Sequence, residues 1–416
     1  MLKSFQILKK AGFVDHLLVL APLRVVTTSW PSQMEYWEDF EGLTHTLIHG
    51  DIPAAMKQDV DVYLMNYEGL LSKHWQHLPT ATKFLTKGRF MLAVDESTKM
   101  KNSNSKRFKT IKKLLPLMEY RTIMTGTPKP NKLEDLFSQC YITDLGDDLG
   151  QYVTHFRRQY MMPSFSGFGF DAQPGAMERV AERIAPTTLQ LEYEEAVPSQ
   201  TVDVILPLPP DTVRHYNELK DEFLTVLGDA VVVAPTVATS LGKLRQFAQG
   251  ALYYEGETLQ IHDVKLDALE NLIAELDGEP LLCFTAFTSD VERIRARLGY
   301  TVPYIGSGTT AAQGAAWCAS FGAGSIPLLL AHPSSAAHGI DGLQNNCSNV
   351  CWFGQTWSWE EFYQANLRVI RSGSKAEQVF IYRIMMDCGV ERAMKLSVEG
   401  KRDSEADFCT LLRELI

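Results

Sequence analysis

The sequence has no uninterrupted run of about 18 apolar residues, so no segment is expected to cross a membrane as a helix. Its first residues, MLKSFQILKKAGF, lack the long apolar core and the small-residue cleavage site of a signal peptide. Cysteine is also scarce: seven cysteines are scattered, and the nearest pair, Cys347 and Cys351, has no second pair at zinc-site spacing. We therefore expect reduced core thiols and a cytoplasmic protein.

Positive charge is in deficit as well, because 40 Lys and Arg residues face 50 Asp and Glu residues, for a formal net charge of −10. This balance argues against a protein that is basic overall, but it does not exclude a local basic groove. One basic segment could either rim a nucleic-acid groove or form a solvated face, and the sequence favours neither. It contains Lys99, Lys101, Lys106, Arg107, Lys109, Lys112 and Lys113.

What the sequence does contain is ample core material, with 45% hydrophobic residues in 416, which suggests two or three domains. Short apolar runs alternate with amphipathic stretches, as expected for parallel sheets with helices on both faces. The predicted strands are 16–22, 61–66, 90–96 and 121–128, then 280–287, 301–306, 326–333, 349–354 and 378–384. The predicted helices are 54–59, 105–118, 132–139, 263–277, 288–299, 311–321 and 359–371.

Two α/β lobes follow from this pattern, with a boundary near residue 195. We expect lobe one to span residues 1–195, with a helical insertion over about 145–195. Lobe two, residues 196–416, should include a segment that links the lobes. The stretch from 145 to 260 is less regular than the rest and holds the Pro-rich LPLPPDT at 206–212.

Two adjacent carboxylates end the apolar run FMLAVDE, at Asp95 and Glu96. In open α/β sheets ligands bind beyond the carboxyl ends of strands. Phosphoryl transfer from a nucleotide needs one carboxylate for Mg²⁺ and a second group that orients or deprotonates the attacking water. The pair fits both roles, although a solvated strand end is the simpler reading of the pair taken alone. The next strand ends in TGTP, whose Thr125, Gly126 and Thr127 could couple a nucleotide site to movement of the other lobe.

Near the C-terminus, QANLRVIRSGS places Gln364, Arg368 and Arg371 at i, i+4 and i+7, which predicts one helix face. Guanidinium groups on such a face could stabilise charge on a nucleotide phosphate, as an arginine finger does. The alternative is a solvated basic face. For the tryptophans Trp352, Trp357 and Trp359, packing is favoured over base stacking.

Taken in order, these segments resemble the motifs of the Swi/Snf-type branch of the superfamily 2 helicase-like ATPases, and most closely its short phage or bacterial members. The resemblance covers nearly the whole chain and implies two RecA-like lobes in a protein of a bacterial or phage-infected cell. The matching segments are LVLAPLRVVTTSW (18–30), LMNYEGL (64–70), VDESTKMKN (94–102), TGTP (125–128), KLRQFAQGALY (243–253), LLCFTAF (281–287), AHPSSAAHGIDGLQ (331–344) and QANLRVIRSGS (364–374).

The resemblance implies a role for each matching residue, with ATP and Mg²⁺ as cofactors. Asp95 would hold Mg²⁺, Glu96 would act as general base, and Arg368 and Arg371 would act on the phosphates. Gln364 would lie at the lobe interface, and Gly339, Asp341 and Gln344 would line the cleft. The implied contacts to the backbone of double-stranded DNA, independent of sequence, are Arg24, Trp30, Asn66, Thr285, Ser334 and His338.

The printed sequence departs from the family most clearly at its start. It contains no GxxxxGK[ST] phosphate loop, and the segment MLKSFQILKKAGF is expected to form the helix that would follow such a loop, with Gly12 as its cap. Ser374 and the Asp-Gly pair at 341–342 are smaller departures. We therefore expect a late-start or truncated form of a DNA-dependent ATPase that translocates on double-stranded DNA. A non-hydrolysing scaffold that binds nucleic acid or protein, including half of a split motor, is the alternative.

Overall fold

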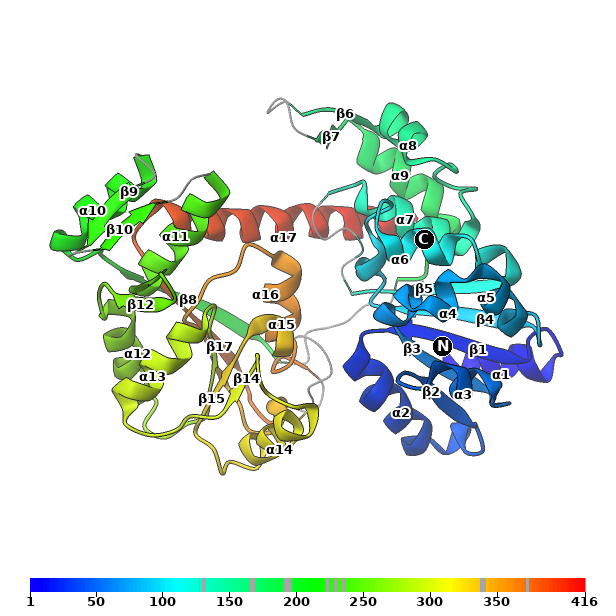
Figure 1. Ribbon diagram of the computed structural model, residues 1–416, viewed down its shortest axis with the longest axis horizontal. Coiled ribbons are helices and arrows are strands. Elements are labelled where there is room, and N and C mark those ends of the chain that lie inside the picture. The colour runs from blue at the N-terminus through cyan, green and yellow to red at the C-terminus, as the bar shows by residue number, and fades with distance from the viewer. Residues whose placement is uncertain are drawn as a thin grey trace. The chain divides into compact units, whose positions relative to one another are not determined.

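The computed structural model divides the chain into two compact units: Met1–Leu191 with Asp403–Ile416, called lobe one, and Glu192–Arg402, called lobe two (Figure 1). The predicted limits of the lobes, 1–195 and 196–416, stay a prediction. The structure describes all residues except 127, 129–131, 165–168, 191–196, 222–223, 228–229, 234–236, 337–341, 372–373 and 416.

Lobe one is built on a five-stranded sheet in the order β2-β3-β1-β4-β5. Every neighbouring pair is parallel, so all the carboxyl ends meet at one edge. The short edge strand β2 was not predicted from the sequence, whereas the other four lie within two residues of their predicted starts. The strands are β1 (His16–Ala21), β2 (His45–Ile48), β3 (Val62–Asn66), β4 (Phe90–Asp95) and β5 (Tyr120–Met124).

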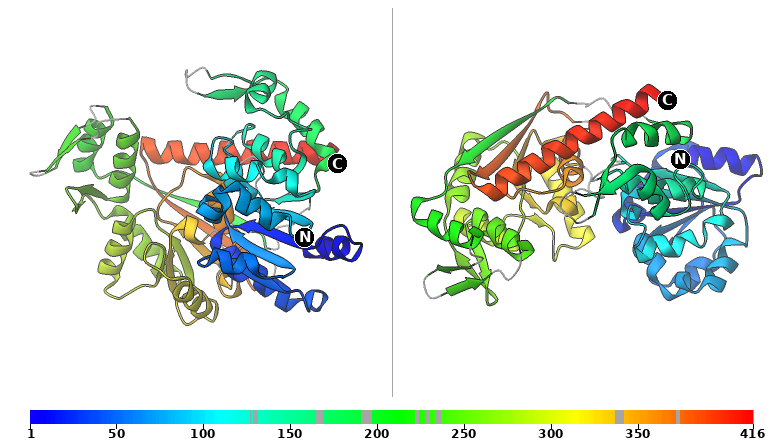
Figure 2. Two further views of the ribbon diagram at one scale, coloured as in Figure 1. Left: turned by 45° about the vertical axis from the view of Figure 1, so that its right-hand side comes forward. Right: turned by 90° about the horizontal axis from the view of Figure 1, so that it is seen from above.

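Helices cover both faces of this sheet (Figures 1 and 2). Leu18 and Leu20 pack with α3, α4, α5, α6 and α7, while Leu17 and Val19 point to the other face and pack with α1 and α2. This alternation is the two-residue period of a strand buried on both sides. The helices are α1 (Leu2–Lys10), α2 (Trp30–Tyr36), α3 (Ile52–Lys57), α4 (Lys73–Gln76), α5 (Leu78–Leu85), α6 (Lys106–Lys112) and α7 (Asp135–Asp144).

The predicted first helix is confirmed as α1. Leu2 and Phe5 are buried on one face, and Gly12 adopts a φ of 76°, the left-handed conformation that glycine accepts without strain. Two helices and a hairpin then form a smaller apolar cluster around Phe137, Phe156 and Tyr160. They are α8 (Val153–Tyr160), β6 (Met161–Pro163), β7 (Phe170–Ala172) and α9 (Ala176–Ile184).

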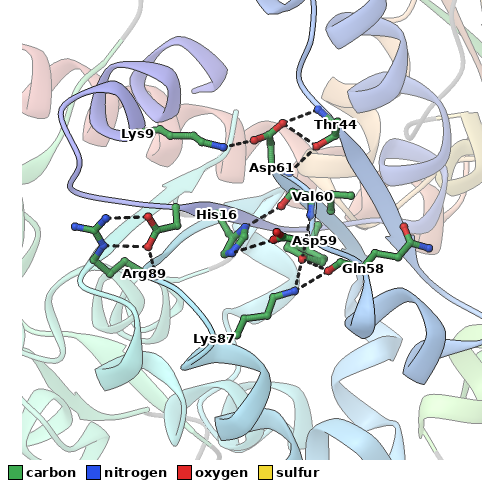
Figure 3. A network of polar contacts seen from close by, with 11 residues as sticks. Lys9, His16, Thr44, Gln58, Asp59, Val60, Asp61, Lys87 and Arg89 are labelled. Atoms are coloured by element: carbon green, nitrogen blue, oxygen red, sulfur yellow. Dashed lines mark hydrogen bonds and ion pairs between the residues drawn. The ribbon is translucent and has the colours of Figure 1, made fainter.

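Side-chain contacts hold the amino ends of β1, β2 and β3 together (Figure 3). The carboxylate of Asp61, just before β3, accepts a hydrogen bond from the Thr44 main-chain N–H at 2.7 Å and pairs with Lys9. The ring Nδ1 of His16 lies 2.8 Å from the carbonyl oxygen of Val60. These groups therefore tie down the amino edge, and the residues predicted to act chemically lie at the opposite, carboxyl edge.

Lobe two is built on a six-stranded sheet in the order β14-β15-β13-β16-β17-β8, again with parallel neighbours. Strand β8 was not predicted; it pairs with β17 over eight residues and widens the sheet. The fold class predicted from the sequence, two mostly parallel sheets with helices on both faces, is confirmed. The strands are β8 (Ser199–Leu206), β13 (Leu281–Phe284), β14 (Tyr304–Ile305), β15 (Leu328–Ala331), β16 (Asn349–Trp352) and β17 (Val379–Met386).

Two apolar clusters again lie on opposite faces of the lobe-two sheet. The face that carries Leu282 packs against α14, α15 and α16, and the face that carries Leu281 packs against α12 and α13. Trp352 is fully buried, as the packing interpretation predicted. The elements are α10 (Pro210–Asp221), β9 (Leu224–Leu227), β10 (Ala230–Val233), α11 (Val237–Gln249), β11 (Ala251–Tyr254), β12 (Glu257–Gln260), α12 (Val264–Glu275), α13 (Thr288–Leu298), α14 (Ala311–Gly322), α15 (Pro333–Ala336), α16 (Trp359–Asn366) and α17 (Gly389–Leu415).

Two expectations about chemistry can be compared with the described residues. Six cysteines are buried and unbridged, as expected for core thiols: Cys140, Cys283, Cys318, Cys347, Cys351 and Cys388. No helix in the described part of the chain is long and apolar enough to cross a membrane.

Candidate nucleotide and nucleic-acid site

Strand β4 delivers Asp95 to the carboxyl edge of the lobe-one sheet. Its first five residues are buried and Asp95, the last, is half-buried. Asp95 pairs in register with Met124 at the end of β5, while on the other side β1 ends at Ala21, opposite Asn66 of β3. The predicted acidic residue thus lies at the strand end where ligands of parallel sheets bind.

Trp30 fixes the Asp95 carboxylate from the segment that follows β1. The indole N–H of Trp30 donates a hydrogen bond of 3.0 Å to Asp95 Oδ2. The chain reaches Trp30 through a π-helical turn, Val25–Ser29, just ahead of Pro31, which has no N–H to continue an α-helical ladder. Burial raises the pKa of Asp95, and the Trp30 hydrogen bond acts against that rise by stabilising the charged form.

A cavity of about 340 Å³ opens beside this carboxylate. An Mg²⁺ ion is commonly held by one or two protein carboxylates, with water and substrate phosphates as its other ligands. The donor set fits that pattern, because the Asp95 carboxylate lines the cavity and is held in place by Trp30. The lining residues are Met1, Leu2, Lys3, Val25, Ser29, Trp30, Gln33, Phe40 and Asp95.

Glu96, the second carboxylate, has a strained main chain. Its φ of 57° lies in the left-handed region, which is unfavourable for a residue with a side chain. The hydroxyl of Tyr67 holds this turn by donating to the carbonyl oxygens of Asp95 at 2.5 Å and Glu96 at 3.1 Å. Burial and the nearby Asp95 and Glu96 charges raise the pKa of Tyr67 well above its usual value, so Tyr67 remains a donor.

A buried chain of hydrogen bonds connects the carboxylate segment to TGTP. Ser97 Oγ lies 2.7 Å from Gln139 Oε1, and Gln139 Nε2 donates to the carbonyl oxygen of Pro128 at 2.9 Å. Both side chains are almost fully buried. Of the predicted coupling residues, Thr125 is half-buried at the end of β5, Gly126 is exposed, and Thr127 lies outside the described residues. Sequence reasoning missed both roles: Gln139 lies outside the matching segments, and Tyr67 lies within LMNYEGL, of which only Asn66 was singled out.

The predicted nucleic-acid contacts of lobe one lie in the segments after β1 and β3. Asn66 is buried at the end of β3 and its Nδ2 donates to Glu68 at 3.1 Å. Arg24 is half-buried where the π-helical turn begins. Trp30 is only 8% exposed and is engaged by Asp95, which leaves its ring little surface for DNA. The DNA roles of these residues stay predictions.

In lobe two, Thr285 and Ser334 both lie at the carboxyl edge of the sheet. Thr285 is buried directly after β13, and Ser334 follows β15, where its Oγ lies 2.8 Å from His332 Nδ1. Between these segments lies a cavity of about 390 Å³. It is lined by Tyr253, Ala286, Phe287, Thr288, Tyr304, Ser307, His332 and Ser335.

The predicted helix 359–371 is wrong beyond Asn366, where α16 ends. The Asn366 side chain is buried and accepts a hydrogen bond from the Trp352 indole at 3.0 Å. After it the main-chain bonds shorten to i→i−3, for example from Val369 N–H to Asn366 O, and Val369 joins the core. Arg368 and Arg371 therefore lie in the turns after α16 rather than on one helix face with Gln364.

The remaining predicted cleft residues are only partly described. Gln344 lies in the short 3-10 turn Leu343–Asn345, where its Oε1 accepts the Gly342 N–H at 3.1 Å. Gln364 is buried on α16. His338, Gly339 and Asp341 lie outside the described residues, so their roles stay predictions.

Comparison with known proteins identifies the family. The profile of the SNF2-related domain matches residues 2–214, which is more than half of the chain. The chain belongs to the SNF2-related family. Its predicted resemblance to the Swi/Snf-type branch of helicase-like ATPases is thereby confirmed.

Individual relatives of this SNF2-related chain are distant. Protein p41 of Acyrthosiphon pisum secondary endosymbiont phage 1 is 27% identical over 373 residues, 85% of this chain and 77% of p41. YwqA of Bacillus subtilis (strain 168), which bears the name of an ATP-dependent helicase/translocase, is 23% identical over 85% of this chain. This SNF2-related chain spans only 38% of YwqA. A Sulfolobus solfataricus SWI2/SNF2 ATPase core solved with double-stranded DNA is 20% identical, with a TM-score of 0.41 over 98% of this chain and 84% of that one.

Proposed function

We propose that this SNF2-related chain is the motor core of a DNA-dependent ATPase that translocates along double-stranded DNA without regard to sequence. The observation that carries the proposal is the Asp95–Glu96 turn. A strained residue kept at a strand end, directly after a half-buried carboxylate that lines a cavity, is the kind of geometry that active sites maintain. Family membership supplies the reaction class.

The side chains at the carboxyl edge of the lobe-one sheet have different roles. Asp95 would hold Mg²⁺, and Trp30 keeps its carboxylate oriented toward the cavity. Glu96 would orient and deprotonate the attacking water. When bound, Mg²⁺ neutralises charge that develops on the transferred phosphate. The roles of Gln364, Arg368 and Arg371 on the nucleotide remain those that the family implies.

The hydrogen bonds around the turn suggest how hydrolysis would be communicated. A shift of the Asp95–Glu96 segment moves Ser97, and Ser97 is bonded to the side chain that also holds Pro128 of TGTP. Buried polar chains with every member bonded are stiff, so they transmit a displacement instead of absorbing it. The proposal therefore assigns Gln139 a positioning role between the carboxylates and the third motif.

The test is ATP hydrolysis by the 416-residue chain with and without duplex DNA, compared with the Glu96→Gln variant. Loss of a general base lowers turnover by roughly 10²–10⁴-fold. Glu119→Gln, an exposed glutamate on the same lobe, is the matched control and should keep wild-type turnover.

The outcomes separate the two candidate functions. DNA-stimulated turnover that Glu96→Gln abolishes and Glu119→Gln preserves supports the ATPase. DNA binding without any turnover supports the non-hydrolysing scaffold. Turnover that survives Glu96→Gln would refute the assigned general base.

A further inference from the structure

The basic segment after the carboxylates is unusual for this chain. Residues 99–113 contain seven Lys or Arg residues and no Asp or Glu, although the whole chain has a net charge of −10. The segment continues directly from the Asp95–Glu96 turn through the 3-10 turn Ser97–Met100 into α6. Such a concentration of one sign on an acidic protein marks it as a candidate surface for an anionic partner.

The structure separates its members into two sets. Phe108 and Ile111 bury one face of α6 in the lobe-one core, so the helix is fixed in orientation. Lys106, Lys109 and Lys113, at i, i+3 and i+7, are exposed. None of these three lysines forms an ion pair with any residue that the structure describes. We call these three the α6 lysine face.

The other basic side chains on α6 are occupied. Arg107 pairs with Glu68 at 2.5 Å, and Lys112 lies 4.1 Å from the ring centre of Tyr141 and donates to the carbonyl oxygen of Gln151. The contrast matters because occupied cations stabilise the lobe, whereas the α6 lysine face has no such internal role among the described residues. Its charge remains available to a partner.

Arg107 also connects the α6 lysine face to the predicted nucleic-acid edge. One oxygen of the Glu68 carboxylate accepts a hydrogen bond from Arg107, and the other oxygen accepts one from Asn66 at the end of β3. The first turn of α6 is therefore held beside the carboxyl end of β3, where one of the predicted DNA contacts lies. A duplex bound at Asn66 would have its backbone close to α6.

We propose that the α6 lysine face is an additional contact surface for the phosphate backbone of a DNA duplex. The inference rests on the proposed function and adds a surface that none of the family motifs contains. Seven residues of helix rise about 10 Å, the axial span of about three nucleotides of one strand at about 3.4 Å each. Lysine ammonium groups bind phosphates as point charges, so the contact would be independent of sequence.

The experiment measures binding of a fluorescently labelled DNA duplex by anisotropy at 50 mM and 200 mM salt. The test variant carries Lys106→Gln, Lys109→Gln and Lys113→Gln. The matched control has the same loss of charge at three exposed lysines elsewhere on lobe one. It carries Lys10→Gln, Lys57→Gln and Lys83→Gln.

Each phosphate contact contributes about 0.9 to the slope of log affinity against log salt, so three lost contacts lower the slope by about 2.7. The effect of a fourfold rise in salt should then shrink by about 40-fold in the test variant. The control should keep the wild-type slope. A variant with arginine at the same three positions should bind as the wild type does, because the contact depends on positive charge at these positions.

The possible outcomes test this inference separately from the proposed function on which it rests. If the wild-type chain binds no duplex at all, the proposed function fails. If the wild type binds and the test variant has the same affinity and slope, the α6 lysine face is only a solvated surface and the inference alone is overturned. If the test variant still binds the duplex as the wild type does but no longer binds polyglutamate, the surface binds an acidic protein, which also overturns the inference.

Discussion

Replacing Lys265 by methionine tests whether a buried charge pair holds lobe two together. The Lys265 ammonium lies 2.5 Å from the carboxylate of Glu391, and the two side chains are 0% and 2% exposed. Lys265 also donates to the carbonyl oxygen of Phe353 at 3.1 Å. The pair therefore joins α12, the segment after β16 and the start of α17.

The expected loss follows from leaving one charge without its partner. Removing one member of a buried ion pair destabilises a protein by about 3–5 kcal/mol, and domains have only about 5–15 kcal/mol in total. In a unit of this size the melting temperature should fall by roughly 10 °C. Burial raises the pKa of Glu391 and the Lys265 charge opposes the rise, so Glu391 in the variant should take up a proton more readily.

The pH dependence has a definite sign. A carboxyl whose pKa is raised by folding contributes stability at low pH and loses that contribution as the pH rises through the raised pKa. The deficit of Lys265→Met should therefore shrink between pH 8 and pH 5. Urea unfolding followed by tryptophan fluorescence measures it at each pH.

Two further variants make the result interpretable. The double variant Lys265→Met with Glu391→Leu replaces both charges and should lie within about 1 kcal/mol of wild type or above it. Lys220→Met removes an exposed pair with Asp221 and should change stability by less than about 1 kcal/mol. A deficit for Lys265→Met below 1 kcal/mol, or one that is equal at pH 5 and pH 8, would refute the reasoning.

Two other changes have equally definite expectations. Trp30→Phe keeps the aromatic bulk but removes the N–H that stabilises charged Asp95, so the pKa of Asp95 should rise further. Mg·ATP binding should weaken by about tenfold, because hydrogen bonds to charged groups contribute about 1.5–3 kcal/mol. Isothermal titration measures this affinity, and an unchanged affinity would contradict the role of Trp30. Burial raises the pKa of Asp290 to about 6. As the pH rises from 5 to 7, the free energy of unfolding of the wild type should therefore fall by about 1 kcal/mol relative to that of Asp290→Asn. Urea unfolding measures this difference, and a difference that stays constant would mean that Asp290 titrates normally.

The central strands were predictable because buried parallel strands are short apolar runs that end in polar residues. Strand β4 is the clearest case, with five buried residues before Asp95. Strand β8, SQTVDVIL, was missed because it lies at an edge of its sheet, where only one neighbour covers it and polar residues are tolerated. The end of α16 was misplaced because Asn366 is held by Trp352 from another element, a contact that no helical period reveals.

The contacts that hold the Asp95–Glu96 segment could not be predicted from the sequence. Three side chains hold it, Trp30, Tyr67 and Gln139, at sequence separations of 65, 28 and 42 residues. None of the pairs follows from local spacing, yet each partner lies in a segment that follows another strand of the same sheet: β1, β3 or β5. Because parallel strands bring all such segments to one edge, topology predicts which segments meet. Which side chain within a segment makes the contact depends on packing, as the π-helical turn before Trp30 shows, and packing is determined only when the whole lobe has folded.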